Sequence, residues 1–199
     1  MDVLFATVFS GWFVDAVALS FFAVAAWMRF VSGRVPSPLR LLGVFLAFRA
    51  SYAAVLSAGQ YYVWSLNDFT ALLLPPYQPL SYFLLYSWAH FWLNLAVLSV
   101  SLAVLWVFFR LIAAWKKDAV AAKDRSLALL LAALVGWPDI VLFIPLALAF
   151  LLVLILFRLP FRASLKKSDF AAALFVSAAA LFAFGGALIE SLRLAVLYI

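Results

Sequence analysis

The sequence contains no cysteine and only one histidine among its 199 residues. Without cysteine, the chain can form no disulfide, thiolate metal site or iron–sulfur cluster, and it carries no cysteine nucleophile. A single histidine also cannot supply both axial ligands of a bis-histidine haem. We therefore expect no cofactor and no bound metal.

Charged residues are also scarce. They make up 11% of the chain, whereas hydrophobic residues make up 70%. The mean hydropathy is +1.19, whereas a soluble domain carries about 25% charged residues. This composition predicts an all-α fold, a polytopic bundle of transmembrane helices. We interpret residues 1–199 as a single integral membrane domain.

The few basic residues are concentrated, since twelve of the fourteen Lys and Arg residues fall in three short clusters. Beside apolar stretches, such clusters indicate anionic lipid headgroups and membrane topology. The net charge of +6 therefore does not predict a nucleic-acid partner. The clusters are Arg29, Arg34 and Arg40; Arg110, Lys116, Lys117, Lys123 and Arg125; and Arg158, Arg162, Lys166 and Lys167.

The apolar stretches between these clusters are long enough to cross a bilayer, which takes roughly 20 residues for ~30 Å of hydrocarbon. Tyr61, Tyr62 and Trp64 follow the second stretch, as expected of an aromatic belt at a membrane interface. We predict about five spans. They cover about 3–28, 39–62, 81–113, 138–157 and 169–198.

Residues 126–157 allow two interpretations, because Gly136-Trp137-Pro138-Asp139 interrupts the apolar run. In the first, 118–135 is an interfacial helix and the chain then crosses once at 138–157. In the second, 126–157 forms a hairpin that returns to the same side, giving six membrane segments. We favour five spans, because half-spans of ~14 residues need shelter from lipid.

The basic clusters also predict an orientation. Placing the loops 29–40 and 110–125 in the cytoplasm, or on an equivalent matrix-like side, puts the N-terminus outside. The third cluster lies on the same side as the other two only if 126–157 is a hairpin.

Asp15 and Arg49 are charged residues at depths where lipid is expected. Counted from the basic loop between their helices, Asp15 lies ~20 Å and Arg49 ~13 Å into the membrane. An arginine side chain can close that gap, and its planar fork suits a carboxylate. The sequence thus predicts an intramembrane polar pair, which either locks two helices together or lines a proton or solute pathway.

Three further polar residues are candidates for transport or contact. His90 and Asn94 are one helical turn apart near the interface opposite the basic side, where a hydrogen-bonded histidine is commoner than a metal ligand. Asp139 directly follows Pro138, and both residue types are common in the first turn of a helix. A broken helix with an acidic residue is also how transporters build binding sites.

No glycine-rich phosphate loop, HExxH motif or GxSxG motif occurs. The sequence therefore favours a non-catalytic membrane subunit or helical scaffold of a larger membrane-embedded complex, energy-transducing or transport. Its expected partners are the lipid bilayer and hetero- or homo-oligomeric membrane subunits, with no nucleic acid. The alternative is a small transporter or channel that uses the Asp15/Arg49 pair. An intramembrane enzyme is the least favoured interpretation.

Overall fold

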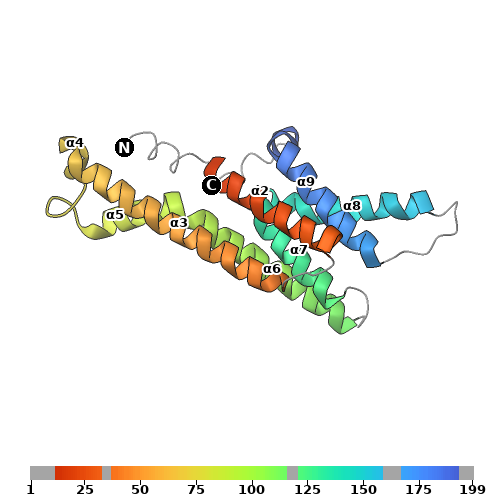
Figure 1. The fold of residues 1–199 in the computed structure, drawn as a ribbon. Coiled ribbons are helices and arrows are strands. Elements are labelled where there is room, and N and C mark those ends of the chain that lie inside the picture. Colours follow the sequence, from red (N-terminus) through yellow and green to blue (C-terminus); the bar gives the residue numbers. More distant parts are fainter. Residues whose placement is uncertain (1–11, 33–36, 116–120, 159–166, 193–199) are drawn as a thin grey trace.

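The computed structural model describes residues 12–32, 37–115, 121–158 and 167–192, which form helices joined by turns. The all-α helical bundle predicted from composition is confirmed. Figure 1 shows two long helices side by side, with most of the other helices gathered along one half of their length. The helices are α2 (Trp12–Trp27), η1 (Met28–Ser32), α3 (Pro38–Leu66), α4 (Asp68–Ala71), α5 (Leu80–Ser87), η2 (Trp88–Trp92), α6 (Leu93–Trp115), α7 (Ala122–Val135), α8 (Ile140–Arg158) and α9 (Lys167–Ser191).

Five of the described helical segments are long and apolar enough to cross a membrane. The chain is therefore an integral membrane protein by the length and composition of its helices. The outer parts of the first and last expected spans, 3–11 and 193–198, lie outside the described residues. The five segments are Phe13–Val31, Pro38–Leu66, Leu80–Trp115, Ile140–Phe157 and Asp169–Ser191.

Helix α7 lies inside the bundle rather than at its edge. Every residue from 127 to 134 is buried, and the helix packs against α2, α3, α6, α8 and α9. A helix lying in the membrane interface keeps one polar face toward water and headgroups. A run of eight buried residues covers all faces of the helix, so residues 127–134 are enclosed by the neighbouring helices. Residues 118–120 of the predicted interfacial helix lie outside the described residues.

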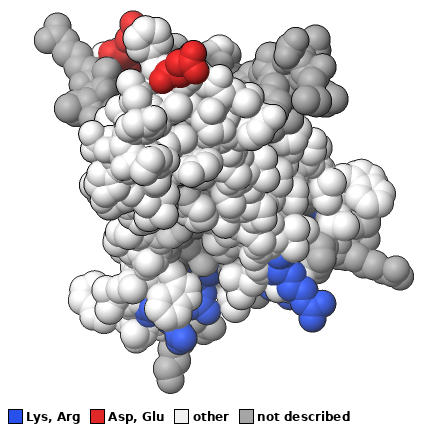
Figure 2. Space-filling view, turned by 90° about the vertical axis from the view of Figure 1, so that its left-hand side faces the viewer, with Lys and Arg blue, Asp and Glu red and all other residues white. Residues whose placement is uncertain are grey.

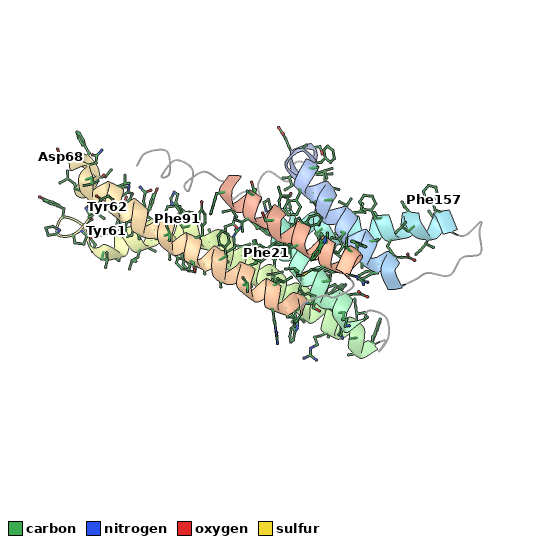
Figure 3. All side chains as sticks on the ribbon, viewed as in Figure 1. Phe21, Tyr61, Tyr62, Asp68, Phe91 and Phe157 are labelled. Carbon is green, nitrogen blue, oxygen red and sulfur yellow. The ribbon has the colours of Figure 1, made fainter. Side chains whose placement is uncertain are left out.

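The turn after α7 reverses the chain within the bundle. Gly136 ends the helix with a φ of +80°, a conformation that glycine adopts without the strain a side chain would add. Pro138 then precedes α8, which leads away to Phe157, at the opposite end of the molecule from Asp68 (Figure 3). With 14 residues, α7 reaches only about 21 Å. This arrangement favours the hairpin interpretation of 126–157.

Acidic and basic side chains lie at opposite edges of the face shown in Figure 2. The acidic ones are at the top of the view, the basic ones at the bottom, and uncharged surface separates them. The first two basic clusters meet at the basic end, because Arg29 lines one hollow with Lys123, and Arg110 lines another with Arg125. Arg34, Lys116, Lys117, Arg162 and Lys166 lie outside the described residues.

Aromatic contacts help to hold α2 in place between α3 and α9. Phe21 meets Phe45 of α3 with ring centroids 5.5 Å apart. On the other side, Phe22 meets both Phe175 and Phe182 of α9 at 5.5 Å in edge-to-face geometry. Such pairs add about 0.5–1.5 kcal/mol beyond area burial. They join the first and last described helices.

The absence of native cysteine allows the hairpin to be tested with single substitutions. We expect Lys123→Cys and Phe157→Cys to react with a membrane-impermeant maleimide from the same side of the membrane, because α8 returns toward the end where α7 begins. Gln78→Cys should react from the opposite side. Labelling of Phe157→Cys from the Gln78 side would show instead that the chain crosses once between 123 and 157.

Candidate functional site

Arg49 forms a hydrogen bond across two long helices. Its Nη2 donates to Oδ1 of Asn94 at 2.9 Å, which links α3 to α6. Arg49 lies about 13 Å along α3 from Arg40, so its charge sits at a depth where charged residues are costly. The amide oxygen gives the guanidinium an acceptor that carries no charge. The bond therefore satisfies one donor of Arg49 and leaves its positive charge in place.

Asp15, the predicted partner of Arg49, contributes through charge rather than through this hydrogen bond. Its carboxylate on α2 and the hydroxyl of Tyr52 on α3 both interact electrostatically with the Arg49 guanidinium. The Asp15 side chain is exposed on the isolated chain. Arg49 is thus the centre of a polar group drawn from three helices, in which Asn94 is the direct partner and Asp15 a nearby opposite charge.

A pocket of about 350 Å³ opens beside this group. It brings together three of the residues that the sequence singled out, Arg49, His90 and Asn94, and adds Tyr52 beside them. Apolar side chains complete the wall. They are Val14, Ala53, Leu56, Phe91 and Leu95.

His90 is held by its own helix. Its Nδ1 lies 2.9 Å from the carbonyl oxygen of Tyr86, so Nδ1 carries the hydrogen of this bond. The imidazole also stacks on the Tyr86 ring, with centroids 4.0 Å apart. The described residues contain no group of three or more His, Cys, Asp or Glu side chains that could hold a metal ion.

The helix widens where His90 occurs. Residues Trp88–Trp92 form a π-helical turn, and the N–H of Leu93 bonds to the carbonyl of Trp88, five residues earlier. Such turns are rare and frequent at functional sites. Ser57 of α3 secures this region, because its hydroxyl accepts hydrogen bonds from Ser87 at 2.6 Å and from Trp92 at 3.1 Å.

Asp139 lies in the turn between α7 and α8. Its Oδ1 is buried and has no hydrogen-bond partner among the described residues. The carboxylate of Asp15 interacts with it electrostatically, and like charges repel. The side chain packs against Gly185 of α9, where an added Cβ would lie 2.6 Å from Oδ1. Asp139 therefore does more than begin a helix, since its carboxyl group also packs against the neighbouring helix α9.

A second feature is a small aromatic knob formed by residues 64–86, which includes Trp64 of the predicted aromatic belt. It has its own core, in which Trp64 contacts Phe83 and Tyr86 with ring centroids 5.6 and 4.7 Å apart. Leu74 is buried in the same cluster. The knob occupies the far end of the two long helices, where Figure 3 labels Tyr61, Tyr62 and Asp68.

The surface of the aromatic knob is apolar. Phe69 is 85% exposed and Tyr77 is 67% exposed, and Leu66 and Leu85 are exposed to a similar extent. Asp68 is the single charged residue between 61 and 89. The knob thus presents large hydrophobic side chains with almost no charge among them.

Comparison with protein-family models found no matching family, and comparisons with curated proteins and with solved structures found no similar chain.

The contact between Asp139 and Gly185 predicts a sensitive position on α9. Gly185→Ala places a methyl group 2.6 Å from Oδ1, so the Asp139 carboxyl group must be displaced, by rotation of its side chain or by separation of the turn from α9. We expect a cost of about 1–3 kcal/mol. Gly43→Ala is the matched control, because nothing lies within 4 Å of the added Cβ. That change should be neutral or stabilise α3 by up to about 1 kcal/mol. Thermal unfolding in detergent measures both, and equal melting temperatures would contradict the close packing.

Proposed function

We propose that the chain is a non-catalytic integral membrane subunit that docks a partner of a larger membrane assembly through its aromatic knob. The observation that carries the proposal is the apolar surface of the knob beyond the reach of the hydrocarbon. The segment Leu80–Trp115 has 36 residues and a length of about 54 Å, well above ~30 Å of hydrocarbon. Helix α3, with 29 residues, extends about 43 Å.

Counting from the basic end supports this position for the knob. About 30 Å from Arg40 along α3 ends near Gln60. The hydrogen bond from Ser87 to Ser57 places the same level near Leu84 on the neighbouring helix. The exposed side chains of Leu66, Phe69 and Tyr77 follow beyond this level. Exposed apolar patches of this kind in polar surroundings mark interaction sites. A partner subunit that covers Phe69 and Tyr77 would remove them from water.

The proposed orientation places the basic end in the cytoplasm and the aromatic knob outside, following the distribution of Lys and Arg. The hairpin formed by α7 and α8 would bring the third basic cluster to the cytoplasmic side as well. All three clusters would then obey the same rule. The docked partner would accordingly be a membrane protein with mass on the outer side.

A negative charge introduced into the aromatic knob should prevent the partner from binding. Phe69→Glu and Tyr77→Glu place a carboxylate on the proposed docking surface, so we expect the partner to be lost when the tagged chain is purified from its native membranes. Trp115→Glu is the matched control, because it places the same charge on an exposed aromatic residue at the basic end, and it should retain the partner. Unchanged co-purification in both knob variants, with normal membrane insertion, would exclude the knob as the docking site.

A second function, transport of protons or cations, is favoured by the unpaired oxygen of Asp139. A buried carboxylate oxygen without a hydrogen-bond partner is costly, and binding a proton or cation at that oxygen reduces the cost. Asp139 lies at a helix break within the bundle, and Asp15 adds a second carboxylate close enough to interact with it. Broken helices with polar groups at this depth build binding sites in transporters.

Flux measurements distinguish the two functions. If the chain transports ions, Asp139→Asn and Asp15→Asn should abolish proton or cation flux in proteoliposomes, and Arg49→Gln should alter it. Asp68→Asn is the matched control, because Asp68 lies in the aromatic knob, away from the polar group. If the purified chain conducts neither protons nor cations, or if the three variants only lower its melting temperature, the transport function is rejected.

A further inference from the structure

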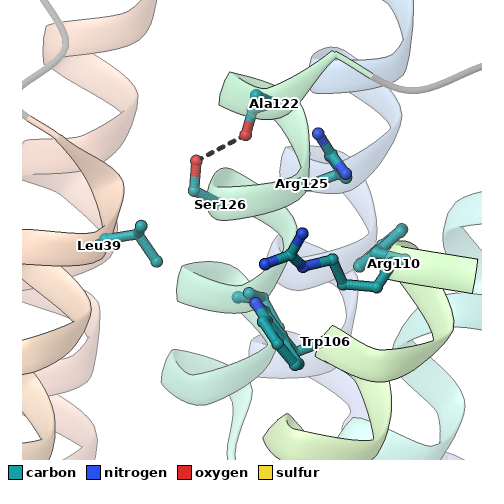
Figure 4. Close-up of a pocket in the computed structure, with 8 residues that line it drawn as sticks. Leu39, Trp106, Arg110, Ala122, Arg125 and Ser126 are labelled. Carbon is teal, nitrogen blue, oxygen red and sulfur yellow. Dashed lines mark hydrogen bonds between the residues drawn. The ribbon is translucent and has the colours of Figure 1, made fainter. Parts of the chain in front are cut away.

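A pocket of about 200 Å³ lies at the basic end, where α3 begins, α6 ends and α7 starts. Arg110 of α6 and Arg125 of α7 line it together with Ser126, and Figure 4 shows the two arginines projecting into the same region from different helices. The hydroxyl of Ser126 donates to the carbonyl of Ala122 at 2.9 Å. The charged donors left for a ligand are therefore the two guanidinium groups.

Apolar side chains form the rest of the pocket wall. Trp106 and Leu39 are about half exposed, whereas Phe109 and Leu129 are buried beneath them. The Arg110 guanidinium lies over the Trp106 ring, 4.9 Å from its centroid. This cation–π contact holds the arginine at the border between the apolar wall and the basic end.

A second hollow of about 600 Å³ adjoins the first and shares Leu39, Ala122 and Ser126 with it. Arg29 and Lys123 line this hollow and extend the positive charge. Asp124 also lines it and is buried. Four cations therefore surround the two hollows with one carboxylate among them.

We propose that the pocket between Arg110 and Arg125 binds the phosphate headgroup of an anionic phospholipid. Planar guanidinium groups match the oxygens of a phosphate and form charge-assisted hydrogen bonds with it. The exposed faces of Trp106 and Leu39 would carry the beginnings of the acyl chains, which a free phosphate does not have. Lipid is thus the source of phosphate that fits both walls. The inference goes beyond the docking of a partner, because the site lies at the end opposite the aromatic knob.

Lipid titration of the purified protein tests the site. Native mass spectrometry should show phosphatidylglycerol bound more tightly than phosphatidylcholine. Arg110→Gln and Arg125→Gln should each weaken phosphatidylglycerol binding about tenfold or more, the loss expected when a hydrogen bond between charged groups is removed. Arg40→Gln is the charge-matched control, since Arg40 is exposed at the start of α3 and lines neither hollow.

Three results would overturn the proposal. An equal loss in Arg40→Gln would show that only the overall surface charge attracts the lipid. Displacement of the lipid by inorganic phosphate at similar concentration would make free phosphate the ligand. Equal binding of phosphatidylcholine would remove the requirement for net negative charge.

A measurement on the unaltered protein covers the case in which an arginine variant does not fold. Phosphatidylglycerol with a photoreactive headgroup, added to the wild-type chain, should crosslink to peptides that contain Arg110 and Arg125. Excess phosphatidylglycerol should suppress this crosslink. Crosslinks confined to other segments would place the lipid elsewhere and reject the site.

Discussion

The constraint on which the rest of the structure depends is that a polar backbone within lipid must be covered by protein. Helix α7 is too short to cross the hydrocarbon, and the turn that follows it lies among other helices. Non-helical backbone at this depth is stable only where neighbouring elements or a polar cavity satisfy it. Helices α2, α3, α6 and α9 surround α7 and supply that cover. Much of the helix packing in the described residues therefore serves to enclose one short helix and its turn.

Enclosure explains the positions of the other features. Helices α3 and α6 both contact α7, so each runs beside it from the basic end into the bundle. Their length carries them past the remaining helices, and the aromatic knob caps the part that projects. The hydrogen bond between Arg49 and Asn94 fastens the two long helices between α7 and the knob.

The sequence predicted the features that depend on the average composition of long segments. Composition, apolar stretches and clustered basic residues were enough for the fold class and for the approximate position of each long helix. Helix α3 begins at Pro38, one residue before the predicted span, and proline is favoured in the first turn of a helix. The enclosure of α7 could not be predicted in this way, because a uniformly apolar helix has the same composition whether lipid or protein surrounds it.

The polar site was predicted only in part, and the reason is geometrical. Depths counted separately from Arg40 and Arg110 have no common origin, because α6 continues beyond the start of α3 at the basic end (Figure 1). Asn94 was therefore assigned to the interface, although it reaches Arg49. Asp139 was recognised as a candidate from its Trp-Pro-Asp context. Its unpaired oxygen depends on α9, a helix distant in sequence.

The cover of α7 has a consequence for how the protein is made. Helix α9 packs against both α7 and α8, yet it follows them in the chain and leaves the ribosome after them. The half-length helix and its turn are therefore synthesised before one of their covering helices exists. Biogenesis requires either a late insertion of the hairpin together with α9 or temporary cover by the insertion machinery. Helix α9 thus completes the cover of α7 only after α7 and α8 have been made.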